Sequence, residues 1–200
     1  ECNPYGLRHS TVPEANRDWS TDYEIMCLIG EGGFGVVHEV RRKTDHTYFA
    51  MKVLCINNEL QHQRAEKEFG ILSQMSHPNI IRFHALYRVE KEIALVMDLC
   101  KGGSLHEMVK ATEETFLGHV CGGLKTPQVT PIMWQMLSGL GYLHLYGFAH
   151  RDIKLENYMV QRSEEYRPTI KLIDFGLCSQ ITPGQKLMSK VGTPHYIAPE

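Results

Sequence analysis

The sequence lacks the cysteine and histidine patterns of metal-binding and disulfide-rich domains. Its 6 cysteines form no CxxC pair and no regular framework, and its 11 histidines contain no HExxH pair. A structural zinc site is therefore not expected. Free thiols in a reducing compartment are the better interpretation of the cysteines.

Strong net charge and long apolar runs are also absent. The 200 residues carry a formal net charge of −2, which gives no support for a nucleic-acid or anionic-membrane partner. No apolar run approaches the ~18 residues of a membrane span. No signal peptide is visible, although the chain begins at Glu1 without a methionine. By default we expect an intracellular, cytoplasmic protein with no nucleic-acid and no membrane partner.

What the chain does contain is enough apolar material for a core. It is 42% hydrophobic and 22% charged, which suits one globular unit or two small lobes. Hydrophobic periodicity predicts strands over 23–29, 48–54, 80–87 and 92–99, helices over 61–75 and 131–145, and a hairpin from 158–160 and 169–173. These elements predict an α+β chain that is strand-rich first and mainly helical later. A hinge near 98–103 would separate two lobes, with the ligand site between them.

Three other segments need their own interpretation. Residues 1–22 are polar with little periodicity, so we expect an N-terminal tail or lead-in that packs loosely. Residues 112–127 are rich in Thr, Glu and Gly and are expected to form an inserted surface loop. In the second long helix, the expected core stripe is Met133, Met136, Leu137, Leu140 and Leu143.

A glycine-rich stretch follows the first predicted strand. Gly30, Gly32 and Gly35 have the G-x-G-x-x-G spacing, which lets a backbone approach phosphate oxygens closely. The alternative is a tight hairpin without a ligand. Strand-like runs on both sides, and Val37 two residues after the last glycine, favour a hairpin lid over phosphates. Lys52 in a following strand could come under this lid; alternatively it is an edge lysine with its head in water.

The stretch from His150 to Asn157 concentrates polar groups that suit phosphoryl transfer. It contains Asp152, Lys154 and Asn157, and a second acidic element, Asp174-Phe175-Gly176, follows. One acid can orient a hydroxyl, the amide and the other acid can hold a divalent metal, and the lysine can neutralise phosphate charge.

With these motifs in order, the chain resembles eukaryotic serine/threonine protein kinases over residues 23–200. The motifs are the glycine stretch, Ala50-Met51-Lys52, His150-Arg151-Asp152, Asp174-Phe175-Gly176 and Ala198-Pro199-Glu200. Segments 171–177 and 192–200 are most similar to the calcium/calmodulin-dependent and calcium-dependent kinases. The resemblance implies a bilobal α+β fold with a small lobe at 23–99. A partial large lobe at 100–200 would lack its C-terminal part, so this fragment should expose apolar helix faces.

The resemblance also implies ATP and Mg²⁺ as cofactors. Lys52 would hold the α- and β-phosphates, and Glu68 would orient Lys52. Glu68 is preferred to Glu66 because it lies nine residues before His77, where the family places the glutamate of this helix. The implied nucleotide-binding residues are Ile29, Gly30, Glu31, Gly32, Gly33, Phe34, Gly35, Val37, Ala50, Lys52, Glu68, Met97, Asp98, Cys100 and Met159. Asn157 and Asp174 would be the Mg²⁺ ligands, since both offer hard oxygen atoms.

The implied catalytic residues are Asp152, Lys154, Asn157 and Thr193. Asp152 would orient the substrate hydroxyl, Lys154 would neutralise the moving phosphoryl group, and Thr193 would contact both. Arg151 and Ser189 are implied regulatory positions, because the activating phosphosite of the family often falls where Ser189 stands. The alternative for Ser189 is an ordinary polar loop serine.

The expected partner is a protein substrate. Lys154 and Gly192-Thr193-Pro194 imply serine or threonine rather than tyrosine as acceptor. Glu156 resembles a position that binds a basic residue near the target, although it could be a solvated loop glutamate. No D-x-D-x-D-G loop occurs, so calcium control is not supported within this chain. A catalytically silent pseudokinase or scaffold is the alternative function. A small-molecule kinase is a third, which Ala198-Pro199-Glu200 argues against.

Overall fold

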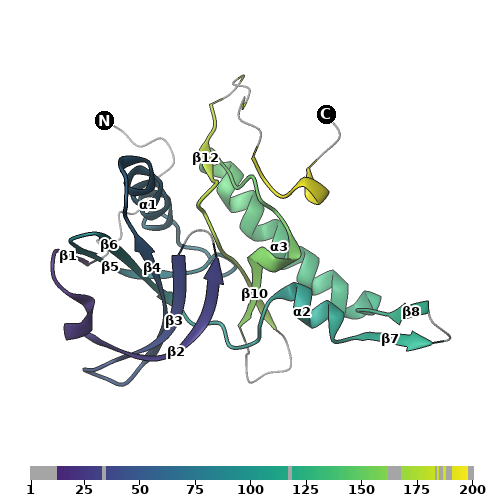
Figure 1. Cartoon of the computed structure of the whole chain (residues 1–200). Coiled ribbons are helices and arrows are strands. Elements are labelled where there is room, and N and C mark those ends of the chain that lie inside the picture. Colours follow the sequence, from purple (N-terminus) through teal and green to yellow (C-terminus); the bar gives the residue numbers. More distant parts are fainter. Residues whose placement is uncertain are drawn as a thin grey trace. The chain divides into compact units, whose positions relative to one another are not determined.

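The computed structural model describes residues 13–32, 35–116, 119–161, 168–182, 184, 187 and 191–197 (Figure 1). The chain divides into two compact units. Unit 1 comprises Glu1–Ser76 and Ile81–Leu99, and unit 2 comprises His77–Ile80 and Cys100–Glu200.

The described residues of unit 1 form a six-stranded sheet, one α-helix and one 3₁₀ turn. Its strands are β1 (Glu14–Ala15), β2 (Tyr23–Gly32), β3 (Gly35–Arg42), β4 (Tyr48–Cys55), β5 (Phe83–Val89) and β6 (Glu92–Asp98), and its helices are α1 (Glu59–Leu72) and the 3₁₀ turn Trp19–Thr21. The strand order is β1-β5-β6-β4-β3-β2. All neighbours are antiparallel except β1 and β5, which are parallel.

The two faces of β4 serve different purposes because side chains alternate along a strand. Phe49, Met51 and Val53 are buried in a core cluster with residues of β2, β3, β5 and β6. Lys52 lies on the opposite face, where it reaches Glu68 of α1. The period-2 pattern of this strand therefore presents one lysine to the helix side of the sheet.

The N-terminal segment differs from the expected loosely packed lead-in. Glu14 and Ala15 pair with Leu86 and Tyr87 of β5, and Trp19 packs against the core cluster. Asp18 begins the 3₁₀ turn, since its carboxylate accepts a 2.8 Å hydrogen bond from the Ser20 amide. Residues 13–22 are therefore part of unit 1.

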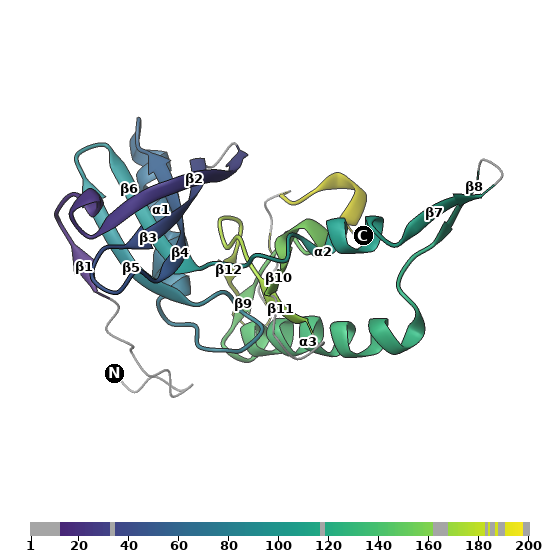
Figure 2. The same cartoon turned by 90° about the horizontal axis from the view of Figure 1, so that it is seen from below.

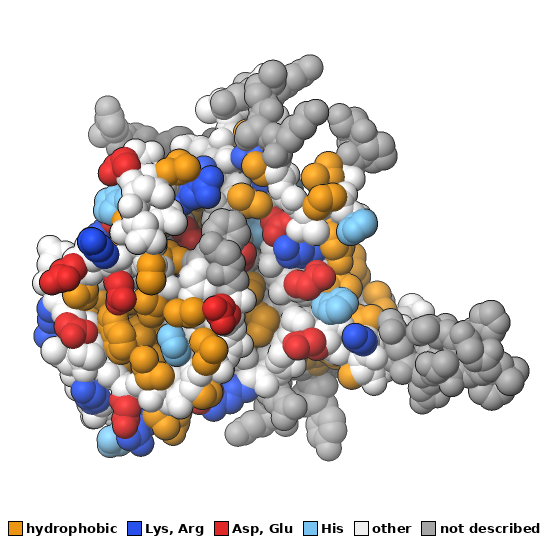
Figure 3. Space-filling model, viewed as in Figure 1, with side chains coloured by type: hydrophobic (Ala, Val, Ile, Leu, Met, Phe, Trp, Pro, Cys, Tyr) orange, Lys and Arg blue, Asp and Glu red, His pale blue; other side chains and the backbone are white. Residues whose placement is uncertain are grey.

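Edge strand β2 exposes several apolar side chains. Ile25, Met26, Leu28 and Ile29 are each between 44% and 55% exposed. Hydrophobic side chains gather over the sheet of unit 1 in the space-filling view (Figure 3). Register shifts in the β2–β3 pairing fall between Ile25 and Cys27 and between Leu28 and Gly30. Consecutive apolar residues can therefore both face outward.

In unit 2, the described residues form helices and three small two-stranded sheets. Its helices are α2 (Leu105–Lys110), α3 (Thr126–Leu145) and the 3₁₀ turns η2 (Leu155–Asn157) and η3 (Pro194–Tyr196), and its strand pairs are β7 (Glu113–Phe116) with β8 (His119–Gly122), β9 (Phe148–Ala149) with β12 (Ser179–Gln180), and β10 (Tyr158–Gln161) with β11 (Thr169–Leu172). Ser104 and Glu107 form a capping box at the start of α2. Gly147 follows the end of α3 with φ +73°, a conformation that glycine adopts without strain.

The stretch 112–127 differs from the expected surface loop. Its centre forms the β7–β8 hairpin, which connects α2 to α3 (Figure 2). Helix α3 begins at Thr126, before the expected start at Pro131. Pro127 is compatible with this start because the first turn of a helix needs no amide donors.

The expected core stripe of α3 is wrong in part. Leu143 is buried, but Met133 is 43% and Leu137 60% exposed. The buried face instead carries Ile132 and Gly139, because a Cβ at Gly139 would already lie 2.9 Å from the Asn79 carbonyl oxygen. The close approach of residues 77–80 selects this face and leaves Met133 and Leu137 exposed. No described helix has the length and apolar character that a membrane span requires.

Candidate active site

The glycine stretch lies in unit 1 at the tip of the β2–β3 hairpin. Gly32 pairs with Gly35, while Gly33 and Phe34 lie outside the described residues. Gly35 has φ +119°, and a Cβ there would lie 2.3 Å from the Val53 carbonyl oxygen of β4. Only glycine permits this approach, which brings the hairpin tip against the strand that carries Lys52.

Lys52 and Glu68 form a buried ion pair. The lysine Nζ lies 2.7 Å and 3.0 Å from the two glutamate oxygens. The side chains are 12% and 6% exposed, so water screens this pair little. Glu66, the other helix acid weighed from the sequence, bonds to Arg88 instead.

The other nucleotide-binding candidates of unit 1 lie on neighbouring strands. Val37 pairs with Gly30 across β2 and β3 and with Lys52 across β3 and β4. Ala50 pairs with Met97 of β6. Asp98 ends β6, where its amide donates a 3.0 Å hydrogen bond to the Arg82 carbonyl and its carboxylate lies 2.6 Å from His84 Nε2. Ile29 and Glu31 are exposed on β2.

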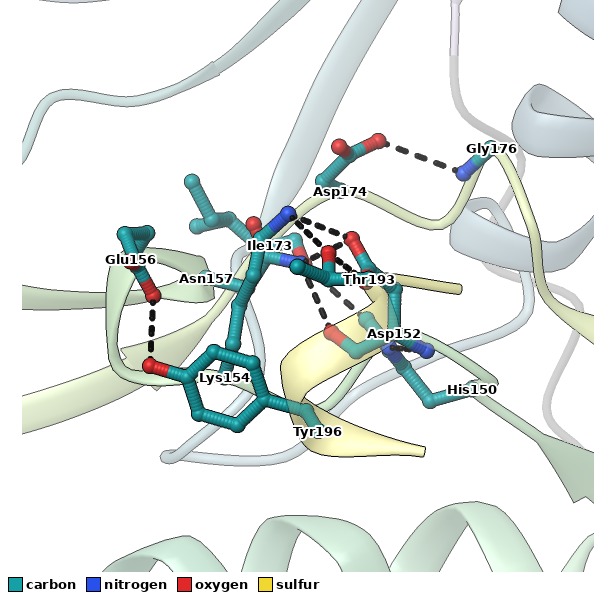
Figure 4. A network of polar contacts seen from close by, with 10 residues as sticks. All are labelled: His150, Asp152, Lys154, Glu156, Asn157, Ile173, Asp174, Gly176, Thr193 and Tyr196. Atoms are coloured by element: carbon teal, nitrogen blue, oxygen red, sulfur yellow. Dashed lines mark hydrogen bonds and ion pairs between the residues drawn. The ribbon is translucent and has the colours of Figure 1, made fainter. Parts of the chain in front are cut away.

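In unit 2, Asp152 is the centre of a polar network (Figure 4). The Asn157 side-chain nitrogen donates to the Asp152 carbonyl at 2.7 Å and to its Oδ2 at 2.9 Å. Lys154 Nζ lies 2.8 Å from the same Oδ2. The short 3₁₀ turn η2 makes this geometry, because it folds Asn157 back over the residue five positions earlier.

Thr193 completes the network from a distant segment. Its hydroxyl donates to Asp152 Oδ1 at 2.7 Å and accepts from Lys154 Nζ at 2.9 Å. The preceding Gly192 has φ +117°, and a Cβ there would lie 2.8 Å from the Arg151 carbonyl oxygen. Gly192 thus lets the chain pass close enough for Thr193 to reach Asp152.

The network controls the protonation of Asp152. Burial alone would raise the pKa of this carboxyl, but hydrogen bonds from Lys154, Thr193 and Asn157 outweigh burial and lower the pKa below its ordinary value of 3.8. Asp152 is therefore ionised at neutral pH and acts as a hydrogen-bond acceptor.

The neutral side chain of His150 connects the loop that carries Asp152 to the backbone at Ile173. Burial lowers the pKa of His150 below its ordinary value of 6.5. Its Nδ1 accepts from the Asp152 amide at 3.3 Å, and its Nε2 donates to the Ile173 carbonyl at 3.0 Å. These two partners fit a single neutral tautomer, and the ring also contacts Phe175 edge-on with centroids 5.2 Å apart.

The hairpin β10–β11 brings the two metal-ligand candidates together. Tyr158 pairs with Leu172, so Asn157 and Asp174 flank the open end of this hairpin. The Ile173 amide also donates to the Asn157 carbonyl at 2.9 Å. Asp174 has φ +61°, an uncommon value outside glycine, and its Oδ1 accepts a 3.4 Å hydrogen bond from the Gly176 amide.

This donor set fits Mg²⁺. The Asn157 nitrogen faces Asp152, so the amide oxygen is the atom that Asn157 can offer a cation. One carboxylate and one amide oxygen, with nucleotide phosphates supplying the rest, are typical of protein magnesium sites. Within the described ranges, no three His, Cys, Asp or Glu side chains gather as a metal site.

The structure describes some of the remaining candidates of unit 2, and the others lie outside the described residues. Arg151 has φ +71° and donates to the Ser179 hydroxyl at 3.0 Å. Met159 forms an isolated bridge with Ser104, and Cys100 is half-buried just after β6. Ser189 and the segment 198–200 lie outside the described residues.

Sequence reasoning missed two contacts around this site. The Tyr196 hydroxyl lies 3.4 Å from Glu156 Oε2, and Ser179 meets Arg151. Neither pairing has a local sequence signal. The close approach of Gly192 did have one, since a glycine stands directly before Thr193.

Comparisons with known proteins identify the family. A family model described as a protein kinase domain matches residues 23–200. The chain is 34% identical to serine/threonine-protein kinase 1 of Arabidopsis thaliana over 96% of this chain and 22% of that protein. It is 33% identical to death-associated protein kinase 2 of Mus musculus over 89% of this chain and 47% of that protein. It is 31% identical to serine/threonine-protein kinase PLK4 of Aedes aegypti over 90% of this chain and 22% of that protein. The chain thus spans from about a fifth to about half of the length of these relatives.

Proposed function

We propose, from the premise that this chain belongs to the protein kinase family, that it transfers the γ-phosphoryl group of ATP to a serine or threonine hydroxyl of a protein. The ordered motifs of the sequence predicted this family, and that prediction is confirmed. The observation that carries the proposed activity is the network in which Asp152 is bonded by Lys154, Asn157 and Thr193 (Figure 4).

Asp152 would orient the attacking hydroxyl. Its lowered pKa keeps it anionic, so it can accept a hydrogen bond from an alcohol. The same low pKa makes it a weak base, so removal of the hydroxyl proton would come late in the transfer. Thr193, bonded to the same carboxylate, would limit where that hydroxyl can lie.

Positive charge on both units would neutralise the phosphates. Lys154 would accompany the moving γ-phosphoryl group, and Lys52, held by Glu68, would bind the α- and β-phosphates. Backbone amides of residues 32–35 would cover the phosphates. Asn157 and Asp174 would hold Mg²⁺, which would offset the negative charge of the phosphates.

The adenine ring would be bound by the apolar candidates. Ile29, Val37, Ala50 and Met159 would enclose it, Met97 would limit its depth, and the backbone of Asp98 and Cys100 would pair with its edge. In this proposal unit 1 is the small lobe and unit 2 is part of the large lobe.

The finer specificity is also part of the proposal. Lys154 and Gly192-Thr193-Pro194 favour serine or threonine acceptors. Glu156, close to Tyr196, would bind a basic residue near the target. Within the family we place the chain nearest the calcium/calmodulin-dependent kinases, by segments 171–177 and 192–200, and inside the cell. All the polar positions of the motifs are filled, which disfavours a silent scaffold.

A phosphotransfer assay on the full-length protein tests this proposal. It uses Mg²⁺-ATP with three matched peptides: a serine in a basic context, the same peptide with tyrosine for serine, and the same peptide with its basic residues made neutral. We expect transfer to the first, little to the second and reduced transfer to the third. An Asp152→Asn protein supplies the background. Equal transfer by wild type and this variant would contradict the assignment.

A further inference from the structure

Helix α1 is anchored to the sheet by two acidic residues on different faces. Glu68 bonds to Lys52 of β4, and Glu66 bonds to Arg88 of β5. Residues two positions apart differ by about 200° around a helix axis. The two ion pairs therefore hold nearly opposite sides of the same turn.

The contact between Arg88 and Glu66 fixes the relative orientation of the two side chains. Its Nε lies 2.8 Å from one Glu66 oxygen and its Nη2 2.9 Å from the other. Such two-point pairing fixes the plane of both groups, which a lysine cannot do. The guanidinium also lies 5.6 Å from the centre of the Phe69 ring, three residues along the same helix face. Phe69 in turn contacts Phe83 of β5 edge-on.

Arg88 also reaches the N-terminal segment. Its Nη1 donates to Glu14 Oε2 at 2.7 Å. Glu14 belongs to β1, which pairs in parallel with β5, and the Leu86 amide donates to the Pro13 carbonyl at 3.1 Å. One guanidinium thus joins a strand upstream of the glycine stretch to the helix that carries Glu68.

We propose that Arg88 is a positioning residue that fixes the rotation of α1 so that Glu68 meets Lys52, and that the N-terminal strand reinforces it through Glu14. A single ion pair is a pivot about which a helix can turn. A second contact on the far face removes that freedom. This inference rests on the proposed function only where it invokes ATP, because Lys52 is the residue that would bind the phosphates.

The competing view is that Arg88 is an ordinary stabilising surface residue. Arg88 and Glu66 are 29% and 30% exposed, and pairs at such sites usually contribute little. A matched control is available in the same sheet. Arg41 Nη2 lies 2.7 Å from Glu24 Oε2 across β2 and β3, with similar exposure of the arginine, and this pair includes no residue of α1.

The test compares Arg88→Ala, Arg88→Lys and Arg41→Ala in the full-length protein. The measurements are amide hydrogen exchange in α1 and the kinetic constants for ATP. For Arg88→Ala we expect faster exchange across α1 and a KM for ATP raised about fivefold, since a smaller fraction of molecules has Lys52 in place. Arg88→Lys should lie between wild type and Arg88→Ala. Arg41→Ala should match wild type in both measurements.

Charge reversal and the N-terminal contact give further arms. Glu66→Arg combined with Arg88→Glu should restore slow exchange in α1 relative to either single variant. Glu14→Ala should shift exchange and KM in the same direction as Arg88→Ala, by a smaller factor. If Glu14→Ala changes neither, the N-terminal part of the proposal is wrong.

A fall in kcat with unchanged KM and unchanged α1 exchange in Arg88→Ala would overturn the positioning role. So would an equal response of Arg41→Ala. If wild type binds no ATP and transfers no phosphate, the proposed function fails. Exchange in α1 still decides the role of Arg88 in that case, because it needs no turnover.

Discussion

The hydroxyl of Thr193 donates a 2.7 Å hydrogen bond to Asp152 Oδ1, although the two residues are 41 positions apart. The same hydroxyl accepts from Lys154 Nζ. One small side chain therefore connects the segment before η3 to both charged groups of the loop before η2. The positions of these charges depend on that segment, so a substitution in the segment should lower activity more than it lowers the stability of the fold.

Replacing Thr193 tests that dependence. Thr193→Ala removes a donor to Asp152 and an acceptor for Lys154, and we expect kcat to fall about 10²-fold, the usual effect of losing one preorganised contact. Thr193→Ser keeps the hydroxyl and should retain most activity. Steady-state kinetics with a basic serine peptide measures both. Equal losses in the two variants would show that the methyl group, not the hydroxyl, matters.

Replacing Lys52 is expected to affect both turnover and stability. In Lys52→Met the Glu68 carboxylate, 6% exposed, loses its cationic partner. We expect turnover to disappear and the free energy of unfolding to fall by about 1–3 kcal/mol. Circular dichroism and denaturant titration should show a folded but less stable protein.

The double variant Lys52→Met with Glu68→Gln provides the control. It removes the buried charge, so it should recover part of the lost stability and none of the activity. Full activity of Lys52→Met would remove Lys52 from the phosphate site. An unchanged unfolding free energy would show that Glu68 finds other partners when the lysine is gone.

The glycine stretch offers a prediction about shape. A Cβ at Gly35 would lie 2.3 Å from the Val53 carbonyl oxygen, whereas a Cβ at Gly30 would meet only Val37 at 3.8 Å, an ordinary contact. Gly35→Ala should therefore destabilise unit 1 by about 1–3 kcal/mol, and Gly30→Ala by much less. Thermal unfolding of the two variants measures the difference. Similar melting temperatures would mean that β3 can shift away from β4 at little cost.

Local patterns were enough to predict most of the regular elements. The mainly apolar stretch of β4 and the apolar run of β6 predicted those strands. Asn58, which caps α1 by accepting from the Gln61 amide, shows why the helix begins at Glu59, earlier than expected. The pairing of β1 could not be predicted in this way. Two residues have no periodicity, and their partner is the edge of β5, which exists only in the folded sheet.

For the candidate site, the sequence predicted residue types but could not predict geometry. Short motifs predicted Asp152, Asn157 and Asp174 as candidate residues because their chemistry and order are distinctive. The positive φ values of Arg151 and Asp174 are imposed by the surrounding structure and leave no sign in the sequence. The link from Arg88 to Glu66 was hidden for a similar reason, since it joins side chains of a strand and a helix that are 22 positions apart.

The neutral His150 makes stability depend on pH. Burial lowers its pKa below the ordinary value of 6.5, so the unfolded chain binds the proton more readily than the fold does. The contribution of His150 is complete above pH 6.5 and is lost as the pH falls towards the lower pKa of the folded state. We expect the free energy of unfolding to decrease below pH 6.5 by up to about 1.4 kcal/mol per pH unit from this group. Denaturant titrations between pH 7.5 and 5 measure the slope.

His77, whose pKa burial also lowers, contributes in the same direction, so the comparison needs both His150→Gln and His77→Gln. His150→Gln should flatten the profile more than His77→Gln, because His150 is only 1% exposed. If His150→Gln keeps the slope of wild type, the imidazole is not held neutral, and its bond to Ile173 does not set the tautomer beneath Asp152.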